Sequence, residues 1–471
     1  MKTYYDYINE LSLDDLRKGL LAYGMFADKL PDFLTAEHFY NYCSRTGFSL
    51  NYTSKMGWDY IRYDSMRNTN VPRALGIPTP FAYYNLCTCI VDNWSNIKQH
   101  FQDKTSSENF KRSQIHIQKR VNGAHLFEMS ANYKDIDGDT IQIIQKQPIG
   151  CLYKVETDIS SCFPSIYSHA LPWALVGKEV AKSNKGDSIW YNQLDKCSRH
   201  LKYNETCGLL IGPHTSNLLS EIILTGVDAQ LSDYNYVRYI DDITYYAKSE
   251  DDAELFIRKL SSELKNYELL LNAKKTHITR IPLPAGEDWI NSLNSFYIEK
   301  EYTADGKPIF RYARLKAYID LAITLVKSTE NLSVYTYMLK VISSYHLGKK
   351  ALTYYIDVIH HLLLTYPYLV HWLDEYIFDK FNIEREKIKE IASQLYKIGI
   401  EKSNYEASSF ALYWSIKYGF DFTGVDLVQN AINSKDCILL LLTYLKRKHI
   451  KEEKRKLKDE ALNYLKKDMD R

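Results

Sequence analysis

Two adjacent aspartates interrupt a stretch of sequence that otherwise suits a β-strand. In "YVRYIDDITYYA" (236–247), every residue except Asp241 and Asp242 is of a kind that a half-buried strand accepts. Two carboxylates about 4 Å apart repel each other by about 4 kcal/mol at an effective dielectric constant of about 20. A fold keeps such a pair only where water, protonation or a cation relieves the repulsion. The stretch therefore predicts two strands joined by a turn that carries both acids.

The segments around this stretch alternate between strand and helix patterns. Residues 151–158 alternate in polarity, and residues 215–229 carry a helical apolar stripe. After the acid pair, residues 249–267 follow a helix pattern that begins with a serine cap, and residues 267–272 again suit a strand. The order of strand, helix, two strands, helix and strand predicts an α+β fold in which helices back an antiparallel sheet.

Both ends of the chain carry helical patterns. The first ninety or so residues are expected to be mostly helical, and residues 103–135 are polar and basic, which favours a hairpin. From about residue 310, amphipathic segments with few glycines predict an all-α region of roughly eight helices, arranged in repeat-like pairs. We expect two domains, residues 1–300 and residues 301–471.

Composition narrows the class of protein. The chain of 471 residues is 45% hydrophobic and 25% charged, as is usual for globular proteins. Its N-terminus lacks the apolar core of a signal peptide, and its longest apolar stretch, residues 437–445, is too short to cross a bilayer. Its eight cysteines form no C-x-x-C pair, so reduced thiols are expected and a structural zinc site is not. We expect a cytoplasmic protein without membrane contact.

A third acid is expected to join the pair. Asp158 ends the strand of residues 151–158 on its polar side. If this strand neighbours the acid-tipped hairpin, three carboxylates meet at one end of the sheet. Such a group suits hard divalent cations, and two of these can activate a hydroxyl and stabilise a leaving pyrophosphate. The alternative is that the acid pair simply marks a solvated turn.

Four stretches in order resemble reverse transcriptases. "RYIDDITYYA" (238–247) resembles the Y-x-D-D signature, motif C, and "KVETDISSCFPSIY" (154–167) resembles motif A. Between them, "GLLIGPHTSNLLSE" (208–221) resembles motif B, and "LLLNAKKT" (269–276) resembles motif D. The resemblance implies a fingers–palm core with a helical region in place of the thumb, and an RNA-directed DNA polymerase, that is, a DNA nucleotidyltransferase using dNTPs.

The same resemblance implies roles for individual residues. Two Mg²⁺ ions would be held by Asp158, Asp241 and Asp242 with the carbonyl of Ile159, and Lys275 would give a proton to pyrophosphate, with Lys274 as the alternative. Phe163 would be the aromatic steric gate that excludes a ribose 2′-hydroxyl. The expected nucleotide-binding residues are Ser161, Cys162, Phe163, Gly212, Pro213, Arg73 and Arg120.

Finer features resemble the bacterial abortive-infection (Abi-type) and related antiphage-defence reverse transcriptases. They lie in residues 72–94, 164–178 and 212–216. That resemblance implies DNA synthesis that starts on a protein hydroxyl, without a supplied template or on a bound noncoding RNA. The DNA would stay covalently attached, and the protein would form a homo-oligomer, a trimer or hexamer. The priming tyrosine is not identified by the sequence, although Tyr4, Tyr5 and Tyr7 lie in a terminus expected to be flexible.

Two other interpretations stay open. A conventional enzyme of retron or group II intron type would copy RNA from a nucleic-acid primer, but Ile211 replaces the usual motif B glutamine. A helical scaffold could instead carry a lapsed polymerase domain. That interpretation leaves the retention of the motif residues unexplained, since an inactive domain has no need of them.

Overall fold

The computed structural model describes residues 3–26, 30–31, 33–45, 48, 56–69, 71–106, 112–117, 127–128, 145–284, 287–299 and 301–469. The chain divides into two compact units. The first contains Met1–Tyr63 and Ala74–Leu283, and the second contains Asp64–Arg73 and Pro284–Arg471. The division near residue 283 thus lies before the expected boundary at residue 300, and a short piece of the N-terminal region belongs to the second unit.

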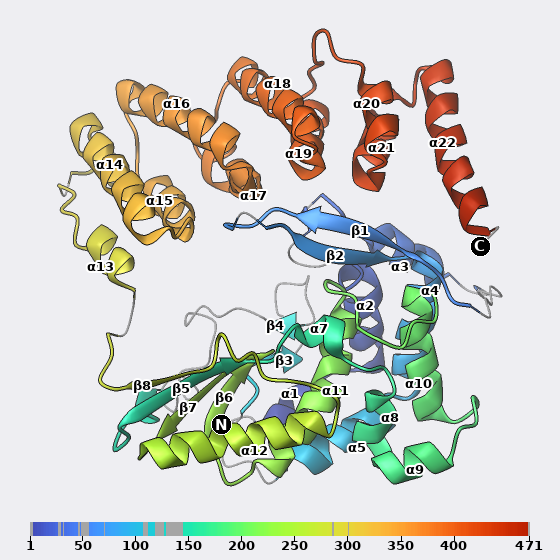
Figure 1. The fold of residues 1–471 in the computed structure, drawn as a ribbon. Helices are drawn as coiled ribbons and strands as arrows, with labels where there is room; N and C mark the ends of the chain where they lie inside the picture. Colours follow the sequence, from blue (N-terminus) through green and yellow to red (C-terminus); the bar gives the residue numbers. More distant parts are fainter. Residues whose placement is uncertain are drawn as a thin grey trace. The chain divides into compact units, whose positions relative to one another are not determined.

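The central sheet of the first unit has four antiparallel strands in the order β6–β7–β5–β8 (Figure 1). Strand β5 lies between β7 and β8, and its last residue, Asp158, is paired with Asp242 at the start of β7. The expected α+β class with a helical C-terminal region is confirmed. The strands are β5 (Tyr153–Asp158), β6 (Tyr236–Tyr239), β7 (Asp242–Ala247) and β8 (His277–Arg280).

Two long helices follow from the sequence pattern and back this sheet. Helix α12 (Glu250–Lys265) contacts β5 and β7, and it begins where the Ser249 side chain accepts a hydrogen bond from the backbone of Asp252. Its apolar face presents Phe256, Leu260 and Leu264 to the core. Helix α11 (His214–Gln230) is buried along nearly all of its length, as expected of a helix inside a core rather than on its surface.

Smaller elements complete the first unit. Helix α1 begins at Tyr4 because Thr3 and Asp6 form a reciprocal capping box. The other helices are α2 (Leu13–Tyr23), α3 (Glu37–Cys43), α4 (Pro80–Asp92), α5 (Trp94–Thr105), α7 (Cys162–Ser165), α8 (Ala170–Val176), α9 (Lys178–Ser183), α10 (Trp190–Arg199) and η1 (His200–Lys202), with α1 spanning Tyr4–Asn9. Strands β3 (His116–Ile117) and β4 (Phe127–Glu128) pair antiparallel; most of the expected hairpin around them lies outside the described residues.

Two expectations about local structure were wrong. The N-terminal region also contains a strand pair, β1 (Tyr60–Ser65) and β2 (Arg73–Pro78), in which burial alternates along the end of β1. The strand expected at 267–272 is a single bridge between Leu271 and Ile159. Glu268, at φ +63°, reverses the chain after α12, so that regular pairing resumes only with β8.

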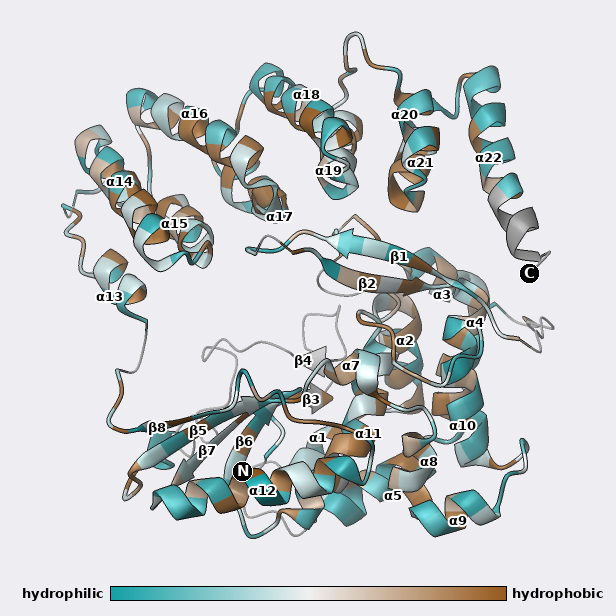
Figure 2. Cartoon of the chain, in the orientation of Figure 1, coloured by the Kyte–Doolittle hydropathy of each residue, from teal (hydrophilic) through white to brown (hydrophobic). Residues whose placement is uncertain are grey.

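The second unit is built from helices that follow one another in pairs (Figure 1). They carry hydrophilic and hydrophobic residues on different sides, as amphipathic packing requires (Figure 2). Its described helices are α13 (Asp288–Asn294), α14 (Tyr312–Thr329), α15 (Ser333–Ser343), α16 (Lys349–Thr365), η2 (Pro367–Leu369), α17 (Val370–Leu373), η3 (Asp374–Phe378), α18 (Arg385–Glu401), α19 (Tyr405–Lys417), α20 (Leu427–Ser434), α21 (Cys437–Arg447) and α22 (Lys451–Met469). Among the described residues of the whole chain, no helix has the length and apolarity needed to span a membrane.

The tip of the β1–β2 hairpin is anchored within this second unit by a buried acid. The Glu406 side chain on α19 is fully buried, accepts a hydrogen bond from the backbone N–H of Met66 at 2.5 Å, and lies 3.3 Å from His371. At the same tip, Asn68 donates to the hydroxyl of Ser333 at 2.6 Å. A buried acceptor of this kind is costly to remove, because its donors are left without a partner.

We therefore expect Glu406→Ala to lower the free energy of unfolding by about 2 kcal/mol. Chemical denaturation of the full chain measures this effect. Glu401→Ala, an exposed glutamate on α18, is the matched control and should change stability little. Equal stability of the two variants would show that Glu406 does not anchor the hairpin tip.

Candidate active site

Strands β6 and β7 form the acid-tipped hairpin, and a turn of two residues joins them. Tyr239 pairs with Asp242, so Ile240 and Asp241 form the turn itself. Ile240 adopts φ +56°, a region that β-branched residues rarely occupy. The carbonyl of Asp241 accepts a hydrogen bond from the N–H of Ile159 at 3.2 Å, which ties the turn to the end of β5. The geometry therefore gathers Asp158, Asp241 and Asp242 at one end of the sheet.

Asp158 is buried and meets a lysine from the loop before β8. Its side chain is 7% exposed; Oδ2 forms an ion pair with Lys275 Nζ, and Oδ1 has no hydrogen-bond partner. The loop is fixed to β5 by the N–H of Asn272, which donates to the carbonyl of Asp158 at 2.9 Å, and by the hydroxyls of Thr157 and Thr276, 2.7 Å apart. This loop, and not a strand at 267–272, brings the motif D lysine to the site.

Burial opposes ionisation of the two hairpin acids. Burial raises the pKa of the Asp241 carboxyl above its usual value, and the neighbouring Asp242 carboxylate raises it further. Partial burial also raises the pKa of Asp242, while the Lys275 ammonium opposes that shift. The hydrogen bond to Asp158 raises the pKa of Lys275, so this lysine is protonated at neutral pH. The site thus holds more negative charge than its one lysine offsets.

The donor set suits a hard divalent cation, but the acids are not preassembled around one. Among the described residues, no three His, Cys, Asp or Glu side chains converge closely enough to hold a metal ion. The carboxylate oxygens are nevertheless the ligands that Mg²⁺ prefers, and the partnerless Oδ1 of buried Asp158 is an acceptor that a cation would satisfy. The Lys275 ammonium at Oδ2 now supplies the positive charge there.

The expected nucleotide-binding residues lie in two loops of the same unit. Ser161, at φ +47°, begins the short helix α7, in which Cys162 is buried and Phe163 is half-buried. Burial raises the pKa of the Cys162 thiol far above its usual value, so this residue is not a thiolate nucleophile. Leu209 donates its N–H to the carbonyl of Phe163 at 2.8 Å, which connects the two loops.

Gly212 and Pro213 lie at the entry to α11. Gly212 has φ +136°, which only glycine adopts without strain, and Pro213 is the N-cap residue. The preceding Ile211 carbonyl accepts the N–H of Gly76 at 2.9 Å, so backbone contacts hold this loop. These positions are consistent with backbone-lined contact to a substrate, and their role stays a prediction.

Three other expectations concern two arginines and the N-terminal tyrosines. Arg73 begins β2 in the segment assigned to the second unit, and Arg120 lies outside the described residues, so both assignments stay predictions. The flexible N-terminus is corrected, because Tyr4 and Tyr7 are buried on helix α1. The hydroxyl of Tyr4 donates to Glu221 at 2.9 Å, so this tyrosine is not available as a primer.

Sequence reasoning missed a buried ion cluster directly behind the hairpin. Arg238, Glu221 and Asp228 are each no more than 2% exposed, and the guanidinium contacts both carboxylates. A signal was present in the sequence. An arginine stands among the apolar residues of "YVRYIDD", and two acids stand seven residues apart on one apolar helix, where two turns place them on one face.

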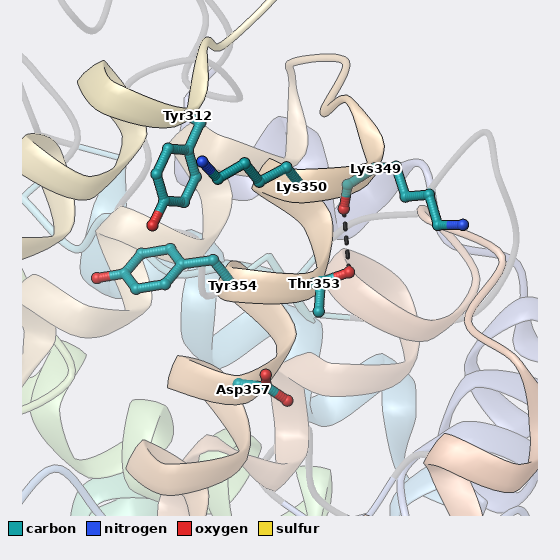
Figure 3. A pocket seen from close by; sticks show the side chains of 6 residues that line it. All are labelled: Tyr312, Lys349, Lys350, Thr353, Tyr354 and Asp357. Atoms are coloured by element: carbon teal, nitrogen blue, oxygen red, sulfur yellow. Dashed lines mark hydrogen bonds between the residues drawn. The ribbon is translucent and has the colours of Figure 1, made fainter.

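The second unit contains a depression whose lining differs from the group of acids at the hairpin. Its volume is about 560 Å³, and Figure 3 shows two lysines, two tyrosines, a threonine and one aspartate around it. The aspartate is already paired with a lysine of α18 at 3.0 Å. The lining has no second carboxylate, so it does not repeat the chemistry of the acid-tipped hairpin. The residues are Tyr312, Lys349, Lys350, Thr353, Tyr354 and Asp357.

Comparison with known proteins defines the class of this domain. Residues 95–313 match the family model described as reverse transcriptase (RNA-dependent DNA polymerase). The chain therefore carries a domain that matches the reverse transcriptases, a family described as RNA-dependent DNA polymerases. Motifs A to D all lie inside the matched range.

Solved structures that match the chain include two of apo telomerase from Candida tropicalis. For the form truncated from its C-terminal domain, the identity is 12% and the TM-score 0.34, with 56% of this chain and 60% of that chain covered. For the other form, the identity is 12% and the TM-score 0.32, with 93% of this chain and 76% of that chain covered. This chain thus spans less than two thirds of the truncated telomerase. A search of curated proteins finds no match.

The charge imbalance predicts how stability depends on pH. The pKa of Asp241 is raised in the folded state, so its ionisation costs stability at neutral pH, and this cost disappears below the unfolded-state pKa of about 4. In metal-free protein, we expect Asp241→Asn to raise the melting temperature at pH 7.5 by on the order of 1–3 °C and to lose this advantage at acid pH. Calorimetry at several pH values measures it. A variant less stable than wild type at pH 7.5 would contradict the assignment.

Proposed function

We propose that this protein is a DNA polymerase of reverse-transcriptase type that joins dNTPs with the help of two Mg²⁺ ions. The observation that carries the proposal is the gathering of Asp158, Asp241 and Asp242, with Lys275, at one end of the sheet, within the range that matches the reverse-transcriptase family. Phosphoryl transfer depends on positioning and charge neutralisation rather than on a protein nucleophile, and this group of side chains offers both.

The chain's own groups have distinct tasks in this proposal. When bound, Mg²⁺ would supply Lewis-acid activation of the attacking hydroxyl and stabilisation of the leaving pyrophosphate. The three aspartates and the carbonyl of Ile159 would hold the ions. Lys275 would exchange its contact with Asp158 for one with the leaving pyrophosphate, to which it would give a proton. Its ion pair keeps it protonated until then.

The biological role belongs to the same proposal. We assign the protein to bacterial antiphage defence, in the cytoplasm, where it extends DNA from one of its own tyrosines and acts as a homo-oligomer. Support comes from the abortive-infection resemblance of residues 72–94, 164–178 and 212–216, and from the helix pairs of the second unit. With Tyr4 and Tyr7 buried, exposed residues such as Tyr297 and Tyr302 are better candidates for the primer.

The conventional alternative is an enzyme that copies RNA from a nucleic-acid primer. The family match favours it, because that family is described as RNA-dependent. Ile211 in place of the motif B glutamine favours the protein-primed reaction instead. The two hypotheses share the site and differ in what supplies the primer and the template.

The deciding experiment adds Mg²⁺ and each labelled dNTP singly to purified protein, with no template or primer. Products are resolved on a denaturing protein gel before and after protease treatment. Label that stays on the denatured protein supports protein priming, and nuclease treatment beforehand tests for a bound noncoding RNA. Incorporation that occurs only with a primed RNA supports the conventional enzyme.

We expect Asp241→Asn to reduce incorporation at least about 100-fold, because it removes a carboxylate from the proposed metal-binding group. Asp251→Asn, an exposed aspartate in the first turn of α12, is the matched control and should retain activity. Full activity of Asp241→Asn would refute the metal assignment.

The proposed role of Phe163 as a steric gate predicts that the enzyme selects deoxyribonucleotides over ribonucleotides. Its ring should clash with a ribose 2′-hydroxyl, so Phe163→Ala should reduce the preference for dNTP over rNTP by roughly tenfold or more. The ratio of kcat/KM for the two substrates measures it. Phe163→Tyr keeps the ring and should keep the preference; unchanged selectivity in Phe163→Ala would remove the gate from this position.

A further inference from the structure

The arginine behind the acid-tipped hairpin uses all of its hydrogen-bonding capacity. Arg238 Nη1 lies 2.8 Å from Glu221 Oε1 and 3.0 Å from the carbonyl oxygen of Ile240, while Nη2 lies 2.6 Å from Asp228 Oδ2 and 3.4 Å from Glu221 Oε2. Nε lies 3.1 Å from Asp228 Oδ2. A guanidinium has five N–H donors in a fixed plane, and each of them has an acceptor here.

The two carboxylates that pair with Arg238 also accept hydrogen bonds from side chains of other elements. Glu221, on α11, also accepts the hydroxyls of Tyr4 and Ser113, each at 2.9 Å. Asp228, on the same helix, accepts the hydroxyl of Tyr236. Side chains from helices α1 and α11, strand β6 and the segment around Ser113 therefore meet in one buried cluster, and its position is fixed from several directions.

One of the five donors serves a different purpose from the others. Four are directed to carboxylates, whereas the bond from Nη1 to Ile240 holds the backbone of the hairpin turn. Ile240 is in the left-handed region at φ +56°, a conformation that costs a β-branched residue energy and persists only where the surroundings impose it. On the other side of the turn, the N–H of Ile159 holds the carbonyl of Asp241 at 3.2 Å. The turn is thus clamped at consecutive carbonyls.

We propose that Arg238 is a positioning residue, which holds the Ile240 turn so that Asp241 and Asp242 face Asp158 in the arrangement that binds divalent cations. The inference rests on the proposed metal-binding role of these aspartates. Charge balance by itself does not require this geometry, because a lysine could neutralise the carboxylates. A lysine has only three donors and no planar fork, and cannot serve two carboxylates and the Ile240 carbonyl in the same geometry.

The test measures Mn²⁺ binding to the full chain by electron paramagnetic resonance, together with kcat and KM for dNTP. We expect Arg238→Lys to weaken Mn²⁺ binding roughly tenfold and to lower kcat 10- to 100-fold, with KM changed little, since misplacement of catalytic groups by about 1 Å has effects of this size. Arg199→Lys is the matched control. It alters another arginine paired with a buried acid, Asp195 at 3.4 Å, and should leave Mn²⁺ binding unchanged.

A second change separates positioning from general stability. Glycine adopts positive φ without strain, so Ile240→Gly in the Arg238→Lys background should restore part of the Mn²⁺ affinity. If Arg238→Lys does not fold, Glu221→Gln is the second variant: it keeps the size of the side chain but replaces one acceptor of Arg238 with an amide donor, and it should weaken Mn²⁺ binding in the same direction. A folded variant with wild-type Mn²⁺ affinity and kcat would overturn the inference, as would absence of rescue by glycine.

Asp241→Asn is measured in parallel to separate the two proposals. If Asp241→Asn binds Mn²⁺ and polymerises as wild type does, the proposed site itself is wrong. If Asp241→Asn loses both properties while Arg238→Lys retains them, the site stands and only the positioning role of Arg238 fails.

Discussion

The mutual repulsion of three carboxylates is the constraint on which the rest of this site depends. The antiparallel register of β5 and β7 places Asp158 opposite Asp242, with Asp241 in the adjoining turn. Burial opposes the ionisation of Asp241 and Asp242 and is the main reason for their raised pKa values, and neighbouring carboxylates raise these values further. Positive charge placed near these carboxylates therefore favours the folded domain.

Two cationic side chains lie near the turn, and they are held in different ways. Lys275, whose side chain is mostly exposed, pairs with Asp158, and in the proposed reaction it would exchange this contact for the leaving pyrophosphate. Behind, Arg238 is fully buried and fixed by two carboxylates, so it cannot be exchanged. An exchangeable partner such as Lys275 can make way for a substrate, whereas a fixed partner such as Arg238 can hold the backbone of the turn in one position. The hairpin turn lies between them, with a residue in a strained conformation that both the arginine and β5 hold in place.

Helices, strands and caps that depend on neighbouring residues were predictable from the sequence, whereas contacts between distant segments were not. The strand–turn–strand around the acid pair, helix α12 with its serine cap, and the helical region after residue 310 follow from periodicity and capping. The strand at 267–272 was predicted from apolar composition, but the turn at Glu268 took precedence. The N-terminal tyrosines were expected to be mobile, but the capping box at Thr3 starts a helix there, Tyr4 and Tyr7 are buried, and Tyr4 is bonded to Glu221 on α11.

The sequence by itself determined which residues could form the site, because Asp158, Asp241, Asp242 and Lys275 stand in motifs whose order and spacing are local properties of the chain. Only the tertiary structure decided which charged groups pair with one another. Lys275 rather than Lys274 pairs with Asp158, and Arg238 joins acids 17 and 10 residues away and, through Glu221, a tyrosine 217 residues distant from that glutamate. Such partners depend on packing between distant segments, which no local pattern encodes.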